Sequence, residues 1–203
     1  MRPILASLAA LFAICLTAAT ARPTLADQLA ELRSTFTVDG KPVPPEIFAD
    51  FGDADLADSD PVVVTIDARA ATGSNRYADP IRTYGRWIIQ TKANDKTMNG
   101  AEETAYEFIG TTRDNLLVVV ASFNGGGSGT FYTLHVLDAA LARAFDADGK
   151  RYDRLNLTLL RSAPLGDRWE GTVAISGNTI RITSPESGPA RGIAPAAIEA
   201  RRP

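Results

Sequence analysis

The chain has 203 residues, 45% of them hydrophobic, and its formal net charge is −3 at pH 7. It therefore lacks the strongly basic field of nucleic-acid-binding proteins, and we expect neither nucleic acid nor an anionic membrane surface as a partner. Its one cysteine, Cys15, and its one histidine, His135, exclude metal sites built from paired histidines or clustered thiolates.

Residues 1–26 have the organisation of a secretory signal peptide, with a positive charge at the second position. The apolar run Ile4–Leu16 is too short for an ordinary membrane-spanning helix, which disfavours the alternative of a retained anchor. Small residues permit cleavage after Ala21 or after Ala26. Pro23 lies just behind Ala21, and because proline close to a cut site disfavours cleavage, the site after Ala26 is favoured. We predict a bacterial periplasmic or secreted protein with no integral membrane segment after cleavage.

Cleavage after Ala26 leaves one domain of about 180 residues, which is large enough to fold without disulfides. It removes Cys15, so the mature chain has no disulfide, thiolate metal site or cysteine nucleophile. It also removes Arg2 and Arg22 from the 21 basic residues and none of the 24 acidic ones, so the mature net charge is 19 minus 24, or −5.

The first part of this domain predicts a helix, a hairpin and a second short helix, at Asp27–Phe36, Phe36–Val43 and Pro44–Phe51. Leu29, Leu32 and Phe36 fall on one face of the first helix. Asp39 and Gly40 form the Asp-Gly signal of a tight hairpin turn. The remainder of the domain has a different pattern.

Short β-branched or alternating segments follow, separated by turn residues. These predicted strands are Val62–Ile66, Gly85–Lys92, Thr104–Thr111, Leu116–Phe123, Phe131–Leu137, Leu155–Arg161, Arg168–Ile175 and Thr179–Thr183. Leu116–Phe123 is apolar on both faces, as a central strand would be. A turn of helix is predicted over Asp138–Phe145, capped by Asp138, and a turn over Pro164–Asp167.

This spacing predicts an all-β fold, mainly an antiparallel sandwich or a barrel-like sheet, with one or two short helices in addition to the signal helix. The single β-rich domain spans residues 27–184. Residues 185–203 are rich in Pro, Gly, Ala and Arg, so we expect a disordered tail.

The candidate binding residues are Gly125, Gly126, Gly127, Ser128, Gly129 and His135. The glycine-rich segment fails the dinucleotide and nucleophile-elbow patterns, because Thr130 stands where both require glycine. A hairpin loop whose backbone approaches a neighbour closely is the favoured interpretation. The remaining functional interpretation is a loop whose exposed backbone N–H groups receive an anion.

His135 lies on an alternating strand, where it shares a face with Phe131, Thr133 and Leu137. A catalytic role needs a nucleophile and an orienting group from other strands, and no such partner is visible in the sequence. We therefore expect a hydrogen-bonded, partly buried strand residue.

Two groups of carboxylates lie in turn-rich segments: Asp53, Asp55, Asp58 and Asp60, and Asp146, Asp148 and Asp153. Neither has the spacing of an EF-hand, because Ala57 and Lys150 stand at the fifth loop positions. Solvated turns are favoured, and no metal site is assigned. A third group could belong to a glycosidase-like acid pair near Tyr106; it comprises Glu102, Glu103 and Glu107.

No catalytic constellation and no cofactor motif are recognised. The leading hypothesis is a non-enzymatic binding or accessory β-domain of the bacterial envelope, with a small ligand or an envelope protein as its partner. A sheet that closes around a cavity would carry a small apolar ligand. The alternatives are a carboxylate-based hydrolase assisted by His135 or Tyr132, and a calcium-stabilised domain.

Overall fold

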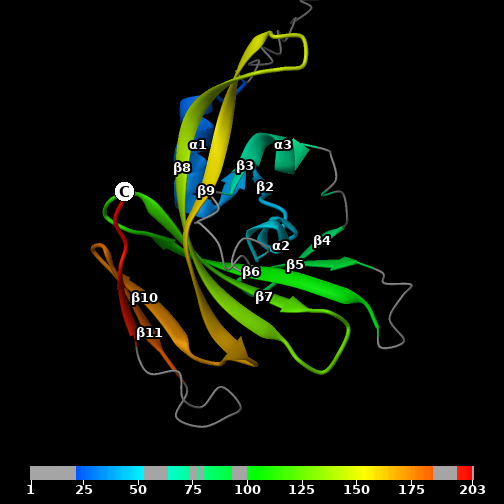
Figure 1. The fold of residues 1–203 in the computed structure, drawn as a ribbon, viewed down its shortest axis with the longest axis vertical. Helices are drawn as coiled ribbons and strands as arrows, with labels where there is room; N and C mark the ends of the chain where they lie inside the picture. Colours follow the sequence, from blue (N-terminus) through cyan, green and yellow to red (C-terminus); the bar gives the residue numbers. More distant parts are fainter. Residues whose placement is uncertain are drawn as a thin grey trace, which may run out of the picture.

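The computed structural model describes residues 22–52, 64–73, 77, 80–92, 100–184 and 196–202. Its centre is a seven-stranded antiparallel sheet of order β3-β9-β8-β7-β6-β5-β4, curled into a half-barrel (Figure 1). The strands are β3 (Thr65–Asp67), β4 (Ile81–Tyr84), β5 (Trp87–Lys92), β6 (Glu102–Thr111), β7 (Leu116–Asn124), β8 (Phe131–Phe145) and β9 (Arg151–Asp167). The mainly antiparallel β-fold is thus confirmed.

An N-terminal layer packs on one face of this sheet (Figure 1). Its elements are α1 (Leu25–Thr35), β1 (Thr37–Val38), β2 (Lys41–Pro42), α2 (Ile47–Gly52) and α3 (Ala68–Gly73). Thr24 and Asp27 form a reciprocal capping box at the start of α1, and Phe36 ends the helix with φ 57°. The predicted helix, hairpin and second helix are therefore confirmed.

Glu31 joins α1 to the β1–β2 hairpin. Its carboxylate accepts hydrogen bonds from Thr37 Oγ1 at 2.6 Å, from Gly40 N at 2.7 Å and from Asp39 N at 3.0 Å. Asp39 and Gly40 have φ values of 53° and 75°, which match the type I′ turn that an Asp-Gly pair favours. Because one carboxylate holds both turn amides, the helix and the hairpin form one unit.

The sheet has a hydrophobic core on each face. Alternate residues of β7 divide between the cores, with Leu117 and Val119 under the N-terminal layer and Val118 and Val120 on the opposite face. All four are almost completely buried. This explains why β7 is apolar on both faces, as its sequence predicts.

A three-stranded antiparallel sheet covers the second face; its strands are β10 (Thr172–Ser176), β11 (Thr179–Thr183) and β12 (Ala196–Glu199). A Cβ atom at Gly171 would lie 2.0 Å from the carbonyl oxygen of Thr183, so only glycine fits there. Asn178 and Asp114 join this sheet to the β6–β7 turn by two hydrogen bonds, of 3.0 and 2.7 Å.

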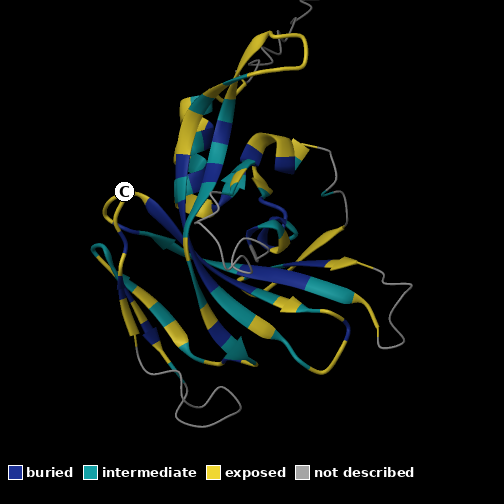
Figure 2. Cartoon of the chain, in the orientation of Figure 1, coloured by how far each residue is buried: buried dark blue, intermediate teal, exposed yellow. Residues whose placement is uncertain are grey.

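The strands β8 and β9 are much longer than predicted. β8 pairs with β9 from Phe131 to Phe145, so the predicted helical turn over Asp138–Phe145 is wrong. The predicted turn over Pro164–Asp167 is also wrong, because β9 continues through it with a register shift that leaves Leu165 buried. The far ends of the two strands form an exposed arm (Figure 2).

Three further expectations need correction. The described residues contain three helices rather than one or two, because α3 forms at Ala68–Gly73, where no helix is predicted. The strand β4 was not predicted. Ala196–Glu199 forms β12 instead of part of a disordered tail, and Ile198 is 7% exposed against the second core. Residues 1–21, 53–63 and 185–195 lie outside the described part of the chain, and so do most of the predicted signal peptide and the first acidic segment.

Candidate functional site

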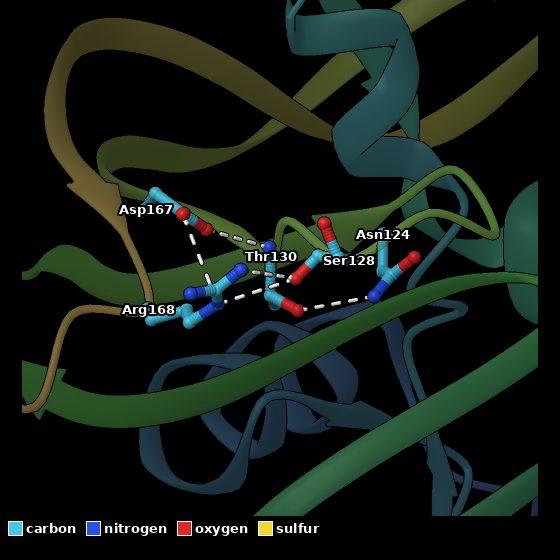
Figure 3. Close-up of polar contacts among 5 residues, drawn as sticks. All are labelled: Asn124, Ser128, Thr130, Asp167 and Arg168. Carbon is cyan, nitrogen blue, oxygen red and sulfur yellow. Dashed lines mark hydrogen bonds and ion pairs between the residues drawn. The ribbon is translucent and has the colours of Figure 1, made fainter. Parts of the chain in front are cut away.

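The glycine-rich loop connects β7 to β8 and is held by side chains at both of its ends (Figure 3). Asn124 Oδ1 accepts a hydrogen bond from Gly126 N at 2.8 Å, and Asn124 Nδ2 donates to Thr130 Oγ1 at 3.1 Å. Asp167 Oδ1 accepts from Thr130 N at 2.8 Å. The amides of Gly126 and Thr130 therefore already donate to side chains of the protein, and they are not available to bind an anion.

Arg168, just past the end of β9 and next to Asp167, also binds the loop (Figure 3). Its Nε and Nη2 atoms donate to the carbonyl oxygen of Ser128 at 3.2 and 2.7 Å. Its own amide donates to the carbonyl of Thr130 at 2.7 Å. Arg168 has φ 48°, a conformation that non-glycine residues rarely adopt. The loop is thus fixed in one shape by its neighbours.

Two of the loop glycines lie against aromatic rings. A Cβ atom at Gly125 would be 3.5 Å from the ring of Phe123, and one at Gly129 would be 3.2 Å from the ring of Phe131. The second distance is closer than an ordinary carbon contact. The expectation that the glycines permit close approach to a neighbour agrees with this geometry.

A pocket of about 190 Å³ lies beside these two rings, on the face covered by the N-terminal layer. Its lining comprises Phe48, Ala49, Thr104, Ala121, Ser122, Phe123, Phe131, Thr133 and His135. Phe123 and Phe131 are 42% and 59% exposed, whereas Ala121 and His135 are 4% and 2% exposed. The pocket therefore runs from an aromatic rim to a buried base.

His135 forms the polar end of this base. Its Nδ1 atom is 3.1 Å from Ser162 Oγ on β9. Its ring centroid lies 5.2 Å from that of Phe48 and 6.2 Å from that of Phe51, both in α2. Burial lowers the pKa of His135 from 6.5 to about 4, so the imidazole is neutral at physiological pH. Within the described ranges its Nε2 atom has no hydrogen-bond partner.

The structure thus separates the predicted site residues into two groups. His135 lines the pocket, together with Phe131 and Thr133, which alternation places on its face. The residues Gly125 to Gly129 do not line it; two of them, Gly125 and Gly129, lie against the two rim rings. Sequence reasoning missed the contribution of α2, because Phe48 reads as an ordinary core residue.

The predicted carboxylate sites do not assemble in the described residues. No group of three or more His, Cys, Asp or Glu side chains there is placed to hold a metal ion. Asp146 Oδ1 accepts hydrogen bonds from the amides of Asp148 and Lys150, as expected of a solvated turn. Glu103 and Glu107 pair with basic residues of β4 and its turn, at 2.7 and 2.8 Å.

Tyr132 and His135 do not share a site. Tyr132 packs between Trp87 and Trp169 in the second core, whereas His135 contacts Phe48 on the opposite face of the sheet. Burial, with a smaller effect of neighbouring carboxylates, raises the pKa of Tyr132, so its hydroxyl stays protonated. The two alternative assistants of a hydrolase, His135 and Tyr132, therefore lie on opposite faces of the sheet.

Of the helices within the described ranges, none is both long and apolar enough to cross a membrane. Comparisons with protein-family models, with curated proteins and with solved structures find no match to this chain.

Proposed function

We propose that this protein is an exported bacterial binding protein without enzymatic activity, and that the pocket ending at His135 receives a small ligand. The signal-peptide pattern of residues 1–26 supports export to the periplasm or beyond. The single observation that carries the binding role is a buried imidazole at the end of an apolar pocket, with one nitrogen bound to Ser162 and the other unpaired in the described structure.

The pocket sets the size and polarity of its ligand. An apolar cavity of about 150 Å³ accommodates benzene, so 190 Å³ suits a molecule of one or two rings or a short chain. None of the lining residues is charged at neutral pH, which disfavours an ionic ligand because burying an unpaired charge is costly. The ligand therefore has an apolar body and one group that forms a hydrogen bond with His135 Nε2.

The low basicity of His135 supports binding over catalysis. Its contact with Ser162 resembles a base and a nucleophile, but a general base is most effective when its pKa lies near the working pH. With a pKa of about 4, His135 would be a weak base at pH 7. No carboxylate is bonded to its ring in the described part of the chain.

A pocket-filling variant tests the binding role. Ala121→Leu fills the base from β7, and Thr133→Leu narrows it from β8; Ala140→Leu makes a matched change at an exposed position of β8. The wild type is screened by thermal unfolding against uncharged phenols, alcohols and amides. A ligand at one hundred times its Kd stabilises by about 2.7 kcal/mol, or a Tm increase of roughly 5–10 °C.

We expect this increase in the wild type and in Ala140→Leu, and its loss in both pocket-filling variants. A screen without any Tm increase, or an increase that survives both pocket-filling changes, would refute the proposal. Each variant is first compared with the wild type by circular dichroism, so that misfolding is not taken for lost binding.

The start of α1 bears on where the signal peptide is removed. Thr24 caps this helix, so cleavage after Ala26 would delete the cap and the first two helical residues, Leu25 included. Cleavage after Ala21 would keep the capping box with Asp27 intact. The cap supports the earlier position, and the mass of the exported protein distinguishes the two.

A further inference from the structure

The rim of the His135 pocket indicates which small molecules enter it. Resting on the binding role proposed above, we infer that the ligand is a flat, uncharged aromatic molecule with one hydroxyl or amide group, whose ring packs against Phe123 and Phe131. Three features carry this inference: the placement of the two rings, the rigidity of their support and the position of the hydrogen-bonding group.

The two rings are the most exposed large hydrophobic side chains in the pocket lining. Phe123 and Phe131 are direct cross-strand partners in β7 and β8, and both remain substantially exposed. Cross-strand rings commonly pack on each other. Here each ring instead lies against its own glycine, Gly125 or Gly129, and both line the pocket. Two aromatic surfaces are therefore available to a ligand at the exposed end of the pocket.

The support of the rings is rigid. The loop that carries Gly125 and Gly129 is fixed by hydrogen bonds from Asn124, Asp167 and Arg168. A ligand therefore does not have to order this loop when it binds, and preorganisation of this kind favours affinity. A flat ring gains the additional attraction of aromatic pairs, about two- to twelvefold in affinity for each pair. A flexible chain gains burial alone and loses rotamer freedom.

The imidazole lies at the opposite end from the rings. His135 is buried at the base, and Thr133 stands between it and Phe131 on the same face of β8, whereas Thr104 is the cross-strand partner of Phe123 at the rim. The ring of Phe48 lies 5.2 Å from the imidazole and closes the side toward α2. An aromatic molecule with its polar group directed at His135 would thus have its ring body at the rim.

Binding of 2-naphthol and 1-octanol, two alcohols of similar hydrophobicity and different shape, tests this inference by calorimetry on the full mature chain. Phe131→Leu retains an apolar side chain and removes the ring. Phe145→Leu makes the same change at an exposed position at the end of β8, outside the pocket lining.

We expect the wild type and Phe145→Leu to bind 2-naphthol at least tenfold more tightly than 1-octanol. Phe131→Leu should weaken 2-naphthol binding two- to twelvefold and leave 1-octanol binding unchanged. Equal affinities for the two alcohols, or equal losses of affinity for both in Phe131→Leu, would refute the inference that the ligand is aromatic. Neither result would contradict the proposed binding role. If neither alcohol binds the wild type, the inference fails, and the wider screen decides separately whether the binding role fails with it.

Discussion

The buried imidazole of His135 should make the stability of the protein depend on pH. Its pKa is about 4 in the folded protein and 6.5 when unperturbed, so between these values the unfolded chain binds the proton more readily. The contribution of His135 to the stability is therefore fully present above pH 6.5 and is lost as the pH falls toward 4. At about 1.36 kcal/mol for each pKa unit, the loss is roughly 3 kcal/mol.

Urea denaturation of the wild type and of His135→Phe at intervals from pH 4 to pH 7.5 measures this contribution. Acidic residues also titrate in this range, so the informative quantity is the difference in unfolding free energy between the two proteins. As the pH falls from 7.5 to 4, we expect the unfolding free energy of the wild type to decrease by roughly 3 kcal/mol relative to that of His135→Phe. His135→Asn, which also lacks the titration but retains a polar group, serves as the second variant.

The chain contains one histidine, so the imidazole C–H signals of an untagged protein in proton NMR all belong to His135, and its pKa can be followed directly. A signal that titrates near pH 6.5 would refute the burial argument. So would a stability difference between wild type and His135→Phe that stays constant from pH 4 to pH 7.5.

Four further substitutions, in three experiments, test the packing of the two layers. Gly171→Ala should destabilise by about 1–3 kcal/mol or more, because its methyl group would overlap the carbonyl of Thr183; an unchanged urea midpoint would contradict this. Glu31→Gln should cost about 1–2 kcal/mol by weakening the bonds to the hairpin turn, and hydrogen exchange should show the turn amides less protected. Asn178→Ala and Asp114→Ala should be non-additive in a double-mutant cycle, whereas strict additivity would mean that the hydrogen bond between the two side chains contributes nothing.

Local sequence patterns predict the parts of the fold that local interactions determine. Asp39 and Gly40 predict the hairpin because aspartate tolerates positive φ and glycine, which has no Cβ atom, adopts it freely. The same reasoning fails for residues 139–145, whose alanine-rich sequence favours a helix. There, pairing of every residue with β9 overrides the helical preference. Pro164 and Gly166 read as a turn, but the register shift between them lets the strand continue past Leu165.

The site was predictable only along single strands. Alternation along β8 correctly places Phe131 and His135 on one face. The contacts of His135 with Phe48 and Ser162 come from α2 and β9, and these depend on long-range packing that periodicity does not encode. The sequence suggests the glycine-rich loop as a ligand site, whereas in the structure Gly125 and Gly129 lie against the aromatic rings of the rim.

The core is built from segments that lie far apart in the sequence, and this separation affects folding. Leu32 and Phe36 complete their packing only with Tyr106 and residues beyond it, and Thr65 in β3 bonds to Thr158, 93 positions later. Contacts this distant in sequence make folding slow, because long loops must close before any of them forms. The N-terminal layer therefore cannot complete its packing until β6–β9 are present, and a chain cut off before β6 should stay unfolded.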